Sequence, residues 1–228
     1  MPMSTPGPEA WIRLLLRRLD EVVWGSLLLV TVSVGAVGAA MADQAGRQAM
    51  RLLGDQSFIG LEYPVLGVQE FCPLMVALVL ALRVGAGFTA ELASLRADDT
   101  FDALTVMGLK PWRTRIAPML VALPLGAIVL TVTSMLTWEL AGVLVMLGRS
   151  GINPFTFVHL EVLSPSLLLL LCAKSAAFGA SVAVGAVFAA MRSPLPGDVG
   201  TTVTRGVVLG TLCALSINLA FDVGWYLA

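Results

Sequence analysis

Five ionisable side chains lie within or beside long apolar runs, and they are the residues best placed to do chemistry. They are Glu70, Arg83, Glu91, Glu139 and Lys174. A charge inside a membrane span is costly, so such residues pair with one another or line the path of a polar solute. Lys174 lies near the middle of its run, and we expect its ammonium to pair across helices with Glu70 or Glu91. The pair could border a transport path. It could instead be purely structural, or Lys174 could reach toward the surface.

Arg83 and Glu91 are eight residues apart, which places them on one face of a helix without direct contact. We expect Arg83 to have a structural role at the start of the polar segment that follows. Catalysis is not expected, because it needs a nucleophile with a base, or a metal cluster. The chain has a single His and no paired carboxylates within its apolar runs. We therefore name no catalytic and no metal-binding residue.

The composition places the chain in a membrane. Of 228 residues, 57% are hydrophobic and 13% charged, and the mean hydropathy is +0.89. A helix that crosses a bilayer needs roughly 20 apolar residues. Five runs qualify: Val22–Ala42, Tyr63–Ala90, Ile116 to about Trp138 with a helix that could continue to Leu147, Val162–Met191, and Val207–Leu227. We predict an all-α polytopic membrane protein with about five transmembrane helices, in which residues 22–228 form one domain. The net charge of −1 argues against a nucleic-acid partner.

Residues 1–21 form a separate N-terminal segment. Between Glu9 and Asp20, one helical face carries Trp11, Leu14, Leu15 and Leu19, which is typical of an interfacial helix lying on the membrane. A cytoplasmic extension of the first span explains the same pattern.

The distribution of Lys and Arg predicts the orientation. With the N-terminus inside, the cytoplasmic segments hold nine of these residues: Arg13, Arg17, Arg18, Arg96, Lys110, Arg113, Arg115, Arg192 and Arg205. The opposite side holds three, Arg47, Arg51 and Arg149. We therefore expect a cytoplasmic N-terminus and a C-terminus on the other side.

The polar segment Glu91–Arg115 is expected to contain a short cytoplasmic helix. Asp99 is placed to cap a helix over Thr100–Met107, while Gly108 and Pro111 are placed to end it. Two turns are unstable alone in water, so the helix needs a surface. That surface is either the lipid head groups, at a simple turn back into the membrane, or a partner protein.

The sequence around this helix resembles the MlaE/YrbE permease family. The stretches "QEFCPLM" (Gln69–Met75), "AKSAAFG" (Ala173–Gly179) and "GDVGTTVTRGVV" (Gly197–Val208) are similar to ordered motifs of that family. The strongest resemblance covers Arg83–Leu120, where these residues match in register: Arg83, Val84, Gly85, Ala86, Ala90, Glu91, Leu92, Asp102, Ala103, Leu104, Met107, Gly108, Pro111 and Pro118.

The resemblance implies the permease subunit of an ABC transporter that moves phospholipid or related lipid between membranes, in a bacterial inner membrane. It implies two permease copies on two ATPase subunits, a periplasmic MCE-domain lipid-binding protein on the outer side, and a STAS-domain protein as a further candidate partner. Residues 92–110 would form the coupling helix, with these contacts to the ATPase: Leu95, Asp98, Asp99, Phe101, Asp102, Leu104 and Met107. The lipid path would include Glu70, Arg83, Glu91 and Lys174.

The chain carries no G-x-x-x-x-G-K-[ST] motif. We therefore expect no cofactor in this chain, with ATP and Mg²⁺ bound by the partner ATPase. Two alternative functions remain open, a scaffold subunit that does not transport and a membrane enzyme that modifies lipid.

Overall fold

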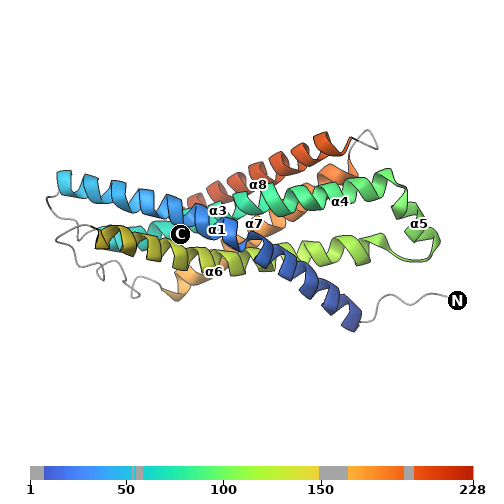
Figure 1. Cartoon of the computed structure of the whole chain (residues 1–228), viewed down its shortest axis with the longest axis horizontal. Helices are drawn as coiled ribbons and strands as arrows, with labels where there is room; N and C mark the ends of the chain where they lie inside the picture. Colours follow the sequence, from blue (N-terminus) through green and yellow to red (C-terminus); the bar gives the residue numbers. More distant parts are fainter. Residues whose placement is uncertain (1–7, 53, 55–58, 149–163, 193–197, 228) are drawn as a thin grey trace.

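The computed structural model describes residues 8–52, 54, 59–148, 164–192 and 198–227. Helices account for all the regular structure of these residues. Five helical segments are long and apolar enough to cross a membrane: Glu9–Leu52, Glu62–Ala97, Trp112–Leu147, Pro165–Met191 and Val199–Gly224. The predicted all-α polytopic architecture is confirmed. Figure 1 shows an elongated bundle with the short helix α5 at one end.

The first helix is longer than predicted. α1 runs from Pro8 to Leu52 without a break, so residues 8–21 continue the first span as one helix. The prediction of a polar connection beginning at Asp43 is wrong, because the helix continues for ten residues. Its residues there are good helix formers, and Arg47 pairs with Asp43 one turn earlier. Whether the first turns of α1 lie on a membrane surface stays a prediction.

The second span is a column of short helical pieces. It comprises α2 (Ile59–Leu66), the π-helix η1 (Gly67–Phe71), α3 (Cys72–Leu80), the π-helix η2 (Ala81–Gly85) and α4 (Ala86–Ala97). Pro73 follows η1 and has no N–H, so the carbonyl four residues earlier, that of Gln69, loses its α-helical donor. Wide π turns inside α-helices are frequent at functional sites.

The short helix after this column forms where it was predicted. α5 spans Thr100–Val106, and Gly108 ends it in the left-handed conformation, with φ of 78°. The N–H of Leu109 donates to the carbonyl of Leu104 at 3.0 Å, which satisfies one of the last carbonyls of the helix. The predicted side-chain cap is wrong. Asp99 precedes the helix, but its own backbone is left-handed, with φ of 52°, and its carboxylate accepts no capping hydrogen bond.

Three long elements complete the bundle. The π-helix η3 (Trp112–Ile116) leads into α6 (Ala117–Leu147), which continues as far as the sequence suggested. α7 covers Pro165–Met191 and α8 covers Val199–Leu227. α8 begins eight residues before the predicted span, because Asp198 accepts a hydrogen bond from the N–H of Thr201 at 3.1 Å and so caps the helix.

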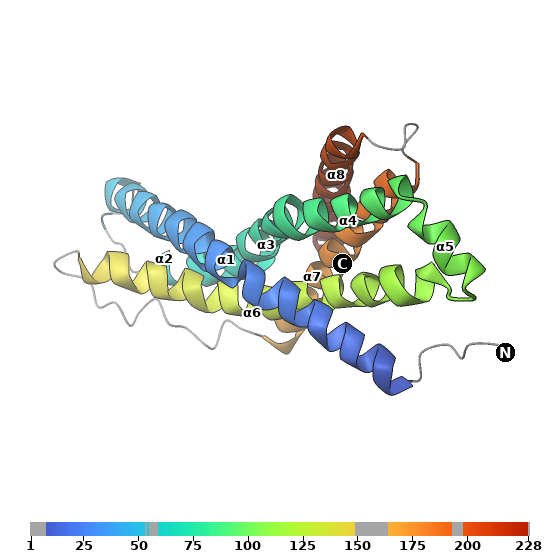
Figure 2. The same ribbon diagram turned by 45° about the vertical axis from the view of Figure 1, so that its right-hand side comes forward.

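The long helices pack as two pairs, α1 with α6 and α7 with α8, and the pairs meet where α6 contacts α7. α1 lies along α6, and α7 lies between α6 and α8. In Figure 2, α7 and α8 cross the column of α3 and α4 at a steep angle. Gly179 and Gly185 of α7 allow the closest approaches. A Cβ on Gly179 would lie 2.6 Å from the carbonyl oxygen of Leu123, and one on Gly185 would lie 2.8 Å from the backbone nitrogen of Gly210. Small residues are what allow membrane helices to pack this closely.

Candidate functional site

A cluster of polar side chains lies inside the bundle, where η1, α7 and α8 meet. Its centre is Lys174 of α7, a residue that is only 1% exposed. The ammonium donates to the backbone carbonyl of Gln69 at 2.6 Å, to Oδ1 of Asp222 at 2.9 Å and to Oε1 of Glu70 at 3.4 Å. The predicted pairing of Lys174 with Glu70 is confirmed.

The sequence explains why η1 can supply two of these acceptors. Pro73 leaves the Gln69 carbonyl without its usual helical donor, and the Lys174 ammonium donates to that carbonyl. Glu70 is the next residue, and in the wide turn of η1 its carboxylate reaches the same ammonium. A buried ammonium is tolerated only when it is paired and hydrogen-bonded. η1 therefore satisfies Lys174 through one backbone acceptor and one charged acceptor.

α8 closes the cluster with two polar residues one turn apart. Asn218 donates through Nδ2 to Oε2 of Glu70 at 3.1 Å and to Oδ2 of Asp222 at 2.9 Å, so its amide joins the two carboxylates. Oδ1 of Asn218 is buried and has no hydrogen-bond partner within the described ranges. Sequence reasoning missed both residues as site members. The signal was available, because Asn218 and Asp222 are spaced i, i+4 in an otherwise apolar span.

The cluster is closed on the side of the ammonium and open on the side of the carboxylates. The Lys174 side chain is 2% exposed, whereas those of Glu70 and Asp222 are 34% and 27% exposed. One ammonium faces two carboxylates, so the accessible oxygens are hydrogen-bond acceptors that Lys174 does not fully occupy. The chemistry of this opening suits a polar group that carries N–H or O–H donors, beside the apolar surface of the spans.

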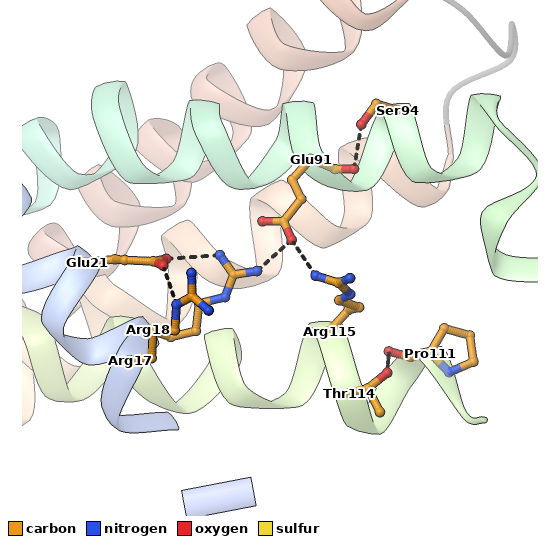
Figure 3. Close-up of polar contacts among 8 residues, drawn as sticks. All are labelled: Arg17, Arg18, Glu21, Glu91, Ser94, Pro111, Thr114 and Arg115. Carbon is orange, nitrogen blue, oxygen red and sulfur yellow. Dashed lines mark hydrogen bonds and ion pairs between the residues drawn. The ribbon is translucent and has the colours of Figure 1, made fainter. Parts of the chain in front are cut away.

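Glu91 does not belong to this cluster, so the alternative pairing with Lys174 is wrong. Glu70 and Glu91 are 21 residues apart on one helical column, and at 1.5 Å per residue this separates them by about 30 Å, the thickness of a bilayer core. Oε1 of Glu91 instead lies 2.5 Å from Nη2 of Arg18 and 3.6 Å from Nη1 of Arg115 (Figure 3). Arg18 also pairs with Glu21 at 3.1 Å.

This second group of charges ties three elements together at the α5 end. Arg18 comes from α1, Glu91 from α4 and Arg115 from η3, so the carboxylate lies between two guanidinium groups of different elements. Charge-assisted pairs of this kind are short and directional. Glu91 therefore joins the N-terminal helix to both arms of the segment that carries α5.

Along the helical column, Arg83 lies between Glu70 and Glu91, and it makes a separate contact with α1. Its Nη1 donates to Oγ of the fully buried Ser26 at 3.1 Å. The guanidinium covers Gly25, where an added Cβ would come within 2.3 Å of Nη1. The expected structural role fits this contact, but Arg83 ties η2 to α1 and does not hold the start of the polar segment. Glu139 of α6 takes no part in either group, and its buried carboxylate oxygens have no hydrogen-bond partner among the described residues.

The residues expected to contact an ATPase gather at α5 and the end of α4. Asp98, Asp99, Asp102 and Met107 are exposed, whereas Leu95, Phe101 and Leu104 are half-buried. Phe101 packs against the hydrophobic core of the bundle. Val106, which the prediction omitted, is 89% exposed, more than any other large apolar residue in the described part of the chain. α5 therefore turns one apolar side to the bundle and presents a second apolar surface, with acidic neighbours, to its surroundings.

The amino-acid sequence of this chain is similar to those of known proteins. The chain is 25% identical over 213 residues to a probable ABC transporter permease protein of Synechocystis, a match that covers 92% of this chain and 80% of the relative. It is 23% identical over 214 residues to a probable ABC transporter permease protein of Rickettsia prowazekii, covering 92% and 82%. The model of the family described as Permease MlaE matches residues 15–223. The chain therefore belongs to the MlaE permease family and is a multi-pass membrane subunit of the ABC transporter permease type.

Proposed function

We propose that this permease moves phospholipid or a related lipid between membranes, with energy from ATP hydrolysed by a partner subunit. The observation that carries the proposal is the Lys174 cluster. A lipid has a polar head and apolar chains, so its path needs accessible polar groups inside an apolar protein. Glu70 and Asp222 are such groups, since their carboxylates are partly open while the ammonium they share is buried.

The proposed coupling element is the segment 92–110, with α5 at its centre. α5 has no buried residue and is too short to be stable without a surface. Its acidic neighbours Asp98, Asp99 and Asp102 argue against lipid head groups as that surface, because the cytoplasmic leaflet is itself anionic. A protein partner with an apolar groove bordered by basic residues fits better, and the ATPase subunit is the proposed occupant.

The proposed orientation follows from the basic residues. Those at the α5 end outnumber those at the other end, so the N-terminus and α5 are placed in the cytoplasm of a bacterial cell and the C-terminus in the periplasm. Residues 22–228 then form the permease domain in the inner membrane, preceded by the N-terminal segment 1–21, for which a position on the membrane surface is part of the proposal.

A second copy of this chain is the proposed neighbour of α8. The exposed large apolar residues of that helix form one stripe, at Val208, Leu212, Leu215, Leu219 and Val223. Such a stripe suits either lipid or another helix, and the family resemblance favours a two-fold pair of permeases. The resemblance also suggests a periplasmic MCE-domain protein, and a STAS-domain protein, as further partners.

The first test is co-purification. The tagged chain is isolated from its native membrane in mild detergent, and the proteins and lipids that accompany it are identified by mass spectrometry. The proposal predicts an ATPase at one-to-one stoichiometry together with bound lipid. A chain that carries lipid and other membrane proteins, but never an ATPase, would instead support the scaffold alternative.

A further inference from the structure

An apolar pocket of about 370 Å³ opens on the flank of the bundle, far from the Lys174 cluster. Trp112 of η3 and Leu120 of α6 line one side of it. The other side is the last part of α7, where it is lined by Val184, Phe188, Met191 and Arg192. The α7 residues of the lining, from Val184 to Arg192, are 10 to 18 residues beyond Lys174, which places them about 15–27 Å from it along the helix axis. The pocket is therefore separate from the proposed lipid path.

The pocket has an apolar body and a cation at one end. Val184, Phe188 and Met191 are exposed and follow the i, i+4, i+7 spacing of one helix face, with the exposed Trp112 opposite them. Arg192 is the charged residue of the lining, and its guanidinium carbon lies 5.0 Å from the centre of the Phe188 ring. Among the residues with described positions, no carboxylate pairs with it. The stacking on Phe188 fixes the cation at the rim without neutralising its charge.

The neighbouring Arg96 is committed elsewhere. Its Nη1 donates to the carbonyl of Ala190 at 3.0 Å and to that of Met191, so it satisfies the carbonyls at the end of α7. Its Nη1 is engaged by these two carbonyls, and its guanidinium adds positive charge beside the pocket. Arg192, unlike Arg96, lines the pocket itself and is the cation that an anionic ligand inside the pocket would meet first.

We propose that this pocket binds one anionic phospholipid of the cytoplasmic leaflet, with its phosphate at Arg192 and an acyl chain along α7 over Phe188 and Val184. The inference rests on the orientation given under the proposed function, which puts this end of the bundle at the cytoplasmic surface. Basic pockets between membrane helices on that side recognise anionic head groups, and Trp favours this depth. The bound lipid would join the end of α7 to η3, the element that follows α5.

Charge and shape favour lipid over protein as the occupant. The lining offers one cation and a continuous apolar wall, which matches an anionic amphiphile. A protein partner that covered it would have to leave Arg192 without a counter-charge or supply a carboxylate at that one place. A second copy of the chain or the ATPase subunit is therefore an alternative that the experiment must detect.

The experiment measures quenching of Trp112 by brominated lipids in the full-length chain, in nanodiscs without an ATPase. Discs contain either brominated phosphatidylglycerol or brominated phosphatidylcholine, and the Trp112→Phe variant isolates the contribution of that residue. We expect an apparent affinity about fivefold higher for the anionic lipid, the factor expected from one basic residue at an anionic membrane surface. Arg192→Gln is expected to abolish the preference and to leave quenching by phosphatidylcholine unchanged.

Arg13→Gln is the matched control, since it removes the same charge from the same end of the bundle but on α1. It is expected to keep the preference. Equal quenching by the two lipids would overturn the proposal, as would a preference that Arg13→Gln reduces as much as Arg192→Gln does. Quenching by neither lipid at Trp112 would also overturn it, by showing that protein covers the pocket. Because no ATPase is present, each of these failures is distinct from a failure of lipid transport.

Discussion

The ammonium of Lys174 lies closer to the carboxylate of Asp222, at 2.9 Å, than to that of Glu70, at 3.4 Å. The two carboxylates come from different elements, one from α8 and the other from η1. Lys174 therefore joins the last span to the second span through α7. Any movement of α8 against the column of α3 and α4 must lengthen or exchange these contacts, which makes the cluster a natural point for substrate to compete with Lys174.

Removing Lys174 should destabilise the protein strongly. In Lys174→Met the carboxylates of Glu70 and Asp222 lose their shared cation. Breaking a fully buried ion pair typically costs about 3–5 kcal/mol, and the partial exposure of these carboxylates lowers the expected cost to about 2–3 kcal/mol. We expect a marked fall in the unfolding temperature in mild detergent, measured by intrinsic fluorescence. The triple variant Lys174→Met with Glu70→Gln and Asp222→Asn restores charge balance and should recover much of the loss. If Lys174→Met is as stable as the wild type, the cluster does not hold the helices together.

Glu91→Gln should affect coupling more than stability. Glu91 is partly exposed, so its ion pairs contribute only about 1 kcal/mol or less. The loss of the link between α1, α4 and η3 is expected to lower lipid movement per ATP hydrolysed while protein abundance is kept. Arg17→Gln is the control, because Arg17 forms only an exposed pair with Glu21 at 3.5 Å. Equal coupling ratios in the wild type and Glu91→Gln would show that the Glu91 pairs have no role in transmission.

The space around Gly179 of α7 and Gly87 of α4 predicts different effects on stability when each is replaced by Ala. Gly179→Ala places a methyl group 2.6 Å from the Leu123 carbonyl oxygen, which cannot move without α6. Overpacking of this kind costs about 1–3 kcal/mol. Gly87→Ala, with nothing within 4 Å of the new Cβ, should be neutral or slightly stabilising, because Ala favours the helix. Thermal unfolding of the two variants in parallel tests the packing, and a stable Gly179→Ala variant would contradict it.

Substitution of Val106 should release the ATPase without unfolding the permease. The side chain is 89% exposed, so Val106→Asp removes no packing within this chain. We expect co-purification of the ATPase to fall at least tenfold, with an unchanged unfolding temperature. Thr105→Asp is the control on the same helix, since Thr105 is exposed and its hydroxyl donates to the Phe101 carbonyl of α5 itself. Retention of the ATPase by Val106→Asp would move the docking surface away from α5.

Much of the architecture could be predicted because membrane spans are set by length and hydropathy. The boundaries were less accurate where polar residues continue a helix. Asp43 and Arg47 look like the start of a connection, but they pair along α1 and support it. Asp99 has a capping residue type, yet its left-handed backbone leaves its carboxylate without a capping hydrogen bond. The intrinsic preference of a residue type does not predict these helix ends and caps, because they depend on the backbone conformation and on the partner of each side chain.

The candidate site was predictable only in part. Lys174 and Glu70 could be named because each is a charge in an apolar run, but the choice between Glu70 and Glu91 depended on the depth of each along the span. Asp222 lies near the end of the last predicted span, where a charge costs little free energy, so the sequence alone does not mark it as a site residue. Asp222 reaches Lys174 because α8 crosses α7 at that point. The sequence periodicity of a single helix does not predict where two helices cross.

The most direct test of the central claim is lipid transfer by the purified permease with its ATPase in proteoliposomes. The measurement follows the loss of a fluorescent phospholipid to acceptor vesicles with ATP, without ATP, and with ATP for Asp222→Asn. We predict transfer that requires ATP and falls at least tenfold in the variant, while the ATPase stays bound. Bound lipid with no ATP-dependent transfer, or an Asp222→Asn complex that transfers at the wild-type rate, would contradict the account.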